Sequence, residues 1–90
     1  MDIKTGNNEF YVEDQQGNKA AQITFFEEKD DEIVIDHTEV AEDLRGQGIG
    51  YQLVEHVVEK ARAENKKIIP QCPYAEKKLK ENDEFHDILA

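Results

Sequence analysis

Short runs of apolar residues alternate with polar residues along the first 40 positions of the chain, a pattern typical of strands. Three segments rich in β-branched and aromatic residues, 9–13, 19–26 and 32–40, predict three strands. The stretch between the first two, Asp14–Asn18, contains turn residues, and the stretch between the last two, 27–31, is charged. Because both connections are short, we expect an antiparallel three-strand meander.

The spacing of the apolar residues changes to that of a helix from Ile49 onward. They mark one face of about four turns: Ile49, Leu53, Val54, Val57, Val58 and Ala61. Asn65 is suited to end this helix.

Residues 66–72 predict a short fourth strand that leads into a second helix. Pro70 cannot donate a ladder hydrogen bond, so the strand must lack a partner there on one side. Pro73 suits the first turn of a helix that runs to about Asn82, with Cys72 at its N-cap.

The predicted order is therefore β-β-β-α-β-α, an α+β fold of the α/β sandwich type. The helix between the third and fourth strands is a crossover, so these two strands should be parallel. Three apolar side chains in the tail, residues 83–90, could dock on the core. A chain of 90 residues is expected to form one domain with a thin core, residues 1–90.

The net charge of -10 is carried entirely by the first half of the chain. Residues 1–44 contain three lysines and thirteen acidic residues, whereas residues 45–90 have eight of each sign. An acidic surface repels nucleic acid and anionic lipid, so neither is expected as a partner. The acidic half could attract a cationic partner such as an amine, or it could serve only solubility.

Other features of the composition exclude further classes of protein. The single cysteine excludes a disulfide framework and a thiolate metal site, and no pair of histidines has ligand spacing beside a third ligand, so no metal is expected. No apolar run approaches the length of a membrane span, and residues 1–10 lack the apolar segment of a signal peptide. We therefore expect a cytoplasmic protein.

The segment Arg45–Gly50, R-G-Q-G-I-G, follows a predicted strand and opens the first predicted helix. The first turn of a helix has unpaired N–H groups and a partial positive charge, and glycines let a ligand approach the backbone closely. This arrangement suits a phosphate or a diphosphate. The alternative is a glycine-rich turn that only lets the helix pack tightly.

Two common phosphate-binding loops do not fit this segment. The pattern G-x-x-x-x-G-K-[ST] is absent. The dinucleotide pattern G-x-G-x-x-G matches at Gly46 and Gly48 but places Tyr51 where the third glycine should be.

The residues Val40–Gly50, V-A-E-D-L-R-G-Q-G-I-G, resemble the acetyl-coenzyme A (acetyl-CoA) motif of the GNAT superfamily of N-acetyltransferases. The family pattern [RQ]-x-x-G-x-[GA] maps onto Arg45, Gly48 and Gly50. The resemblance implies that the preceding strand, at Glu39 and Val40, lines the pantetheine arm. It also implies a cofactor-binding set made of Val40, Arg45, Gly46, Gln47, Gly48, Ile49 and Gly50.

A narrower resemblance links the chain to small, truncated GNAT proteins. These show H-T-E-V before the loop and C-x-Y after the next strand, which are here His37–Val40 and Cys72–Tyr74. The chain lacks the N-terminal helices and the last pair of strands of ordinary GNAT enzymes, which usually form the acceptor-substrate wall. The acceptor therefore stays open, and exposed strand edges would allow a homodimer.

Four side chains are candidates for the chemistry of amine acetylation. Tyr74 resembles in position the general acid of many GNAT enzymes, and His37 or Glu39 could act as base. A backbone N–H near Val40 could polarise the thioester carbonyl. Cys72 at a helix N-cap would have a stabilised thiolate that could carry the acetyl group, or it could be a buried packing residue.

Three functions are compatible with these residues. The first is transfer of acetyl from acetyl-CoA to a small amine or to a protein lysine or N-terminus. The second is a non-catalytic module that binds acyl-CoA or CoA. The third is a structural partner protein with an incidental glycine turn.

Overall fold

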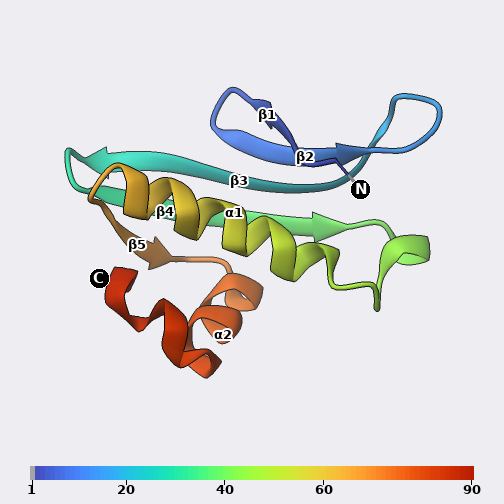
Figure 1. Cartoon of the computed structure of the whole chain (residues 1–90). Coiled ribbons are helices and arrows are strands. Elements are labelled where there is room, and N and C mark those ends of the chain that lie inside the picture. The colour runs from blue at the N-terminus through green and yellow to red at the C-terminus, as the bar shows by residue number, and fades with distance from the viewer. Residues whose placement is uncertain (1) are drawn as a thin grey trace.

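The computed structural model describes residues 2–90, so Met1 lies outside the described residues. Five strands form one sheet in the order β1-β2-β3-β4-β5 (Figure 1). Their bounds are β1 Lys4–Gly6, β2 Glu9–Glu13, β3 Lys19–Lys29, β4 Glu32–Val40 and β5 Lys67–Pro70. The helices are α1 Ile49–Ala63 and α2 Pro73–Glu81, with 3-10 turns η1 at Glu42–Leu44 and η2 at Asp83–Ile88.

The predicted meander is confirmed, because β2, β3 and β4 pair antiparallel in chain order. The predicted parallel pairing of the strands on either side of the crossover helix is confirmed for β4 and β5. Strand β1 was not predicted. It has only three residues, K-T-G, and no apolar alternation, and it exists because the turn at Asn8, with a φ of 58°, returns the chain to pair with β2.

The core lies between α1 and one face of the sheet. Alternate residues of β2, β3 and β4 face the helix, and the apolar face of α1 covers them (Figure 1). The main buried contributors are Phe10, Val12, Ile23, Phe25, Ile33, Ile35, Leu53, Val54, Val57, Val58 and Ile68. The other face of the sheet carries Phe26, which is 38% exposed.

The end of α1 follows the sequence prediction. Asn65 adopts a left-handed φ of 57° just beyond the helix. This conformation lets the N–H of Lys66 donate to the carbonyl of Ala61 at 2.8 Å, which closes the last turn. None of the helices formed by residues 2–90 is long and apolar enough to cross a membrane.

The C-terminal segment docks on the core, as predicted. Phe85 and Ile88 of η2 are buried, and Leu89 forms an isolated parallel bridge with Ile68 of β5. The segment therefore covers part of the outer edge of β5.

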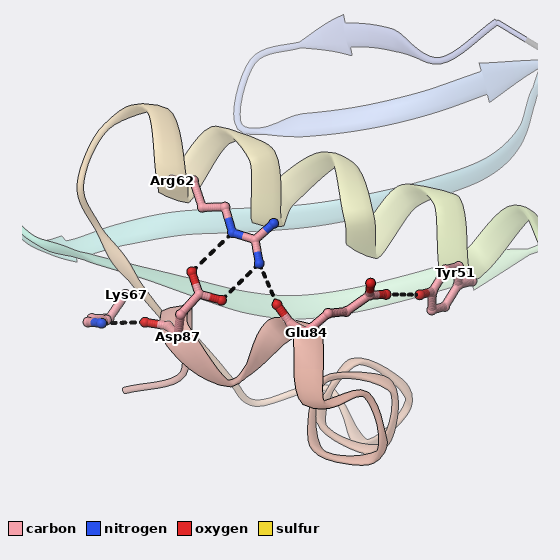
Figure 2. A network of polar contacts seen from close by, with 5 residues as sticks. All are labelled: Tyr51, Arg62, Lys67, Glu84 and Asp87. Carbon is pink, nitrogen blue, oxygen red and sulfur yellow. Dashed lines mark hydrogen bonds and ion pairs between the residues drawn. The ribbon is translucent and has the colours of Figure 1, made fainter.

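Polar contacts from α1 hold the same segment in place (Figure 2). The Arg62 guanidinium donates two hydrogen bonds to the Asp87 carboxylate, Nε at 3.1 Å and one terminal nitrogen at 2.8 Å. The Tyr51 hydroxyl donates to Glu84 Oε1 at 2.9 Å, and this hydrogen bond and burial raise the pKa of Tyr51 to about 12. Because Tyr51 and Arg62 lie near opposite ends of α1, these contacts hold η2 along the length of that helix.

We predict that Phe85→Ala lowers the free energy of unfolding by about 3–5 kcal/mol, because the side chain is 3% exposed and fills the core beneath η2. The matched control Phe26→Ala, on the open face of the sheet, should cost roughly 1 kcal/mol. Urea unfolding followed by circular dichroism measures both. Equal losses would show that the tail does not complete the core.

Candidate functional site

Strands β4 and β5 separate after Ile35, and this separation creates the site. The last paired residues are Ile35 and Pro70. The carbonyl of Ile35 accepts from the N–H groups of both Gln71, at 2.9 Å, and Cys72, at 3.1 Å. The chain then turns away into α2. Residues 36–40 of β4 consequently have no strand partner on this side within residues 2–90.

A bulge at Asp36 decides which side chains of β4 face the helices. Ile35 pairs with Phe25, but the next pair is His37 with Thr24, so Asp36 is an extra residue. The Thr24 hydroxyl donates to Asp36 Oδ1 at 2.6 Å and holds the pKa of that carboxyl below its usual value. The His37 Nδ1 atom lies 3.4 Å from the other carboxylate oxygen.

Beyond the bulge, the side chains alternate in a new register. Thr38 and Val40 pair with the core residues Ile23 and Ala21, so they point toward the helices. His37 and Glu39 therefore share a face, and it is the face of the sheet opposite α1.

The backbone N–H and C=O groups of β4 also alternate in direction, toward β3 at one residue and toward the open edge at the next. The N–H of Ala41 donates to β3, at the carbonyl of Ala20, over 2.7 Å. The N–H and C=O of Val40 must then point to the open edge, and Arg45 Nε donates to this carbonyl at 3.3 Å. The Val40 N–H is thus directed into the gap between β4 and the start of α2.

The glycine loop presents unpaired amides at the start of α1. Gly46 and Gly48 have left-handed φ values of 83° and 76°, and Gly48 is the N-cap. The first helical bond is donated by Gln52, so the N–H groups of residues 46–51 have no acceptor within residues 2–90. The first turn contains no acidic residue and no capping side chain. These donors are therefore available to an anion.

An open groove with a volume of about 840 Å³ connects these features. It is bounded by β3, the end of β4, the glycine loop and the first turns of α1 and α2. Its lining consists of Lys19, Ala20, Ala21, Gln22, Thr38, Glu39, Val40, Ala41, Leu44, Arg45, Gly46, Gly48, Ile49, Gly50 and Tyr74. Every predicted cofactor-binding residue except Gln47 lines the groove.

Cys72 lies behind the groove, at the N-cap of α2 as predicted. It is 7% exposed, and its Sγ atom lies 3.5 Å from the Thr38 hydroxyl. Burial raises the pKa of the Cys72 thiol, but the Thr38 hydroxyl and the amides of Ala75 and Tyr74 together lower it below its ordinary value. A lowered pKa favours the thiolate, which is the nucleophilic form.

The structure divides the four predicted catalytic side chains between two places. Tyr74 lines the groove and Cys72 adjoins it, on the same side as the helices. Glu39 borders the groove, whereas His37 does not, and both side chains belong to the opposite face of the sheet. Thr38 contacts Cys72, although the sequence predicted no role for this residue of the H-T-E-V motif. This contact exists because the bulge turns Thr38 toward the helices.

A family model described as GCN5-related N-acetyltransferase matches residues 9–88. The chain belongs to this family. It is also similar to a GCN5-like protein from Staphylococcus aureus whose solution structure is known, with 43% identity, a TM-score of 0.85, and coverage of 99% of this chain and 87% of that one. No curated protein matches the sequence.

Larger members of the GNAT family share the fold at lower identity. An acetyltransferase from Elizabethkingia anophelis, with acetyl-CoA bound, has a TM-score of 0.59 at 22% identity and covers 69% of this chain. Rv2747 from Mycobacterium tuberculosis, in complex with CoA, has a TM-score of 0.61 at 20% identity and covers 70%. The chain spans about 40% of the length of each. These two likenesses confirm the GNAT fold that the motif implied.

We predict that the thiol of this GNAT protein reacts with iodoacetamide with a pH midpoint below that of an unperturbed cysteine. Thr38→Val removes the hydroxyl next to Sγ, so the pKa should rise and alkylation at neutral pH should slow. Thr38→Ser keeps the hydroxyl and should retain the wild-type profile. Mass spectrometry of the alkylated chain follows the reaction, and a valine variant as reactive as wild type would contradict this role of Thr38.

Proposed function

We propose that this chain is a cytoplasmic N-acetyltransferase that binds acetyl-CoA and transfers its acetyl group to an amine. One observation carries the proposal: the unpaired edge of β4 and the unpaired amides at the start of α1 open onto the same groove. CoA consists of an arm that contains amide groups, joined to a diphosphate. The open edge of β4 can pair with the arm, and the amides at the start of α1 can bind the diphosphate.

The diphosphate would be held by the amides of the glycine loop and the positive end of α1. At Gly46 and Gly48, a Cβ would meet no atom within 4 Å, so the space above the loop is free for a ligand. Arg45 adds a positive charge at the rim of the groove. The neutral second half of the chain therefore supplies the anion site, while the acids of the first half lie mainly elsewhere.

The pantetheine arm would run along residues 36–40 of β4. It has amide groups that can pair with an exposed strand edge, as an added strand does. The Val40 N–H points into this gap and would donate to the thioester carbonyl as negative charge develops there.

The residues on the helix side of β4 support a transfer through sulfur. The Cys72 thiolate would attack the thioester carbonyl, the carbon–sulfur bond to CoA would break, and Tyr74 would give its proton to the departing thiolate. An amine would then attack the acetyl carbonyl on Cys72, the Cys72 thiolate would leave, and the proton released from the amine would return to the Tyr74 phenolate. Direct transfer to an amine, with Glu39 or His37 as base, would approach from the opposite face of the sheet.

We predict that Gly48→Glu abolishes CoA binding, lowering the affinity at least about hundredfold, because it places a carboxylate where the diphosphate would lie. Gly17→Glu is the matched control. Gly17 has a φ of 85° and an equally open Cβ position, but it lies in the turn between β2 and β3. Both variants should lose similar stability, roughly 1–2 kcal/mol, from the left-handed backbone.

Isothermal titration calorimetry with CoA measures the affinity, and thermal unfolding measures the stability. The proposal fails if wild-type protein does not bind CoA at millimolar concentration. It also fails if the two glutamate variants bind equally well.

A non-catalytic CoA-binding module is the second candidate, because the chain spans only part of the length of larger GNAT proteins. For an enzyme, we predict that Cys72→Ala and Tyr74→Phe keep CoA affinity within a few-fold but lower turnover by about 10²-fold or more. Release of CoA thiol from acetyl-CoA with a lysine-containing peptide measures turnover. Intact mass spectrometry detects acetyl on Cys72. A binding module would show neither signal in the wild-type protein.

A further inference from the structure

Gly50 contacts Tyr74 so closely that any larger residue at position 50 would require the tyrosine side chain to move. A Cβ built on Gly50 would lie 2.7 Å from the Tyr74 hydroxyl oxygen, 2.9 Å from Cζ and 3.1 Å from Cε2. The other two loop glycines differ, since a Cβ on Gly46 or Gly48 would have no neighbour within 4 Å. The three glycines of the motif therefore do not share one role.

The backbone conformation of Gly50 does not require a glycine. Gly50 lies in the first turn of α1, and its φ is not in the left-handed region, unlike those of Gly46 and Gly48. Alanine favours a helix more strongly than glycine does. What requires the missing Cβ is therefore a neighbour of Gly50, either the tyrosine or a ligand.

The side chain of Tyr74 lies between Gly50 of α1 and Lys78 of α2. Tyr74 is 37% exposed, although it lies at the start of α2 against the first turn of α1. The ammonium group of Lys78, one turn further along α2, lies 5.6 Å from the ring centroid. The phenol oxygen lies directly against Gly50, so this contact restrains the end of the ring.

We propose that Gly50 is a positioning residue for Tyr74. By lacking a Cβ, it lets the phenol rest on the first turn of α1 and form the wall of the groove between the diphosphate site and Cys72. This inference rests on the proposed function of the groove. It assigns Gly46 and Gly48 to the ligand and Gly50 to the tyrosine.

The alternative role of Gly50 is to let the diphosphate approach the helix. The two roles make opposite predictions in a protein without the tyrosine ring. If Gly50 acts through Tyr74, removing the ring also removes the need for glycine. If Gly50 admits the ligand, alanine is harmful whether or not the ring is present.

A double-mutant cycle separates these roles by calorimetry with CoA on wild type, Gly50→Ala, Tyr74→Ala and the double variant. We expect Gly50→Ala alone to weaken binding on the order of tenfold, a typical coupling between touching residues. In the Tyr74→Ala background, the same change should alter the affinity less than twofold. Equal weakening in both backgrounds, or no weakening in wild type, would overturn the proposal.

A spectroscopic measurement tests the contact without any ligand. Protein labelled with 3-fluorotyrosine has three fluorine signals, and the Tyr74 signal is the one lost in Tyr74→Phe. Gly50→Ala should shift this signal and leave that of Tyr11, on β2, unchanged. If wild-type protein does not bind CoA, the proposed function fails, yet a shifted signal still shows that residue 50 contacts the Tyr74 ring. An unmoved signal refutes the positioning role even if CoA binds.

Discussion

The site depends on the end of hydrogen bonding between β4 and β5 at Ile35 and Pro70. The Ile35 carbonyl accepts from the N–H groups of both Gln71 and Cys72, and the chain turns away from β4 at this point. The same three residues that end the strand thus begin the turn into α2. This turn leaves the edge of β4 open and sets Cys72 at the N-cap of α2.

The bulge at Asp36 gives this open edge its chemical character. Without the extra residue, the alternation of β4 would turn His37 and Glu39 toward the helices and Thr38 away from them. With it, Thr38 meets Cys72, and the imidazole and carboxylates of β4 gather on the open face. The groove side therefore holds a thiol, a hydroxyl and a phenol, whereas the other side holds the groups that could act as bases.

Sequence patterns predicted the parts of this fold that depend on neighbouring residues. The helical spacing from Ile49, the glycine loop and the N-cap before Pro73 are local signals, and each was found where expected. The short strand β1, the bulge and the contact of Gly50 with Tyr74 depend on residues distant in sequence. A motif shows that Gly50 must be small, but only packing shows which neighbour requires it.

The distribution of charge explains how so acidic a chain could hold an anion. Of the thirteen acidic residues in positions 1–44, only Glu39 lines the groove, against the two cations Lys19 and Arg45. Lys19 is already paired with Glu9 at 2.7 Å, so few mobile charges remain to attract a diphosphate. Fixed backbone dipoles need no such charges, since they are oriented by the helix itself and lose no side-chain freedom on binding. A glycine loop at a helix start is therefore the kind of anion site that an acidic protein can keep without a cluster of arginines.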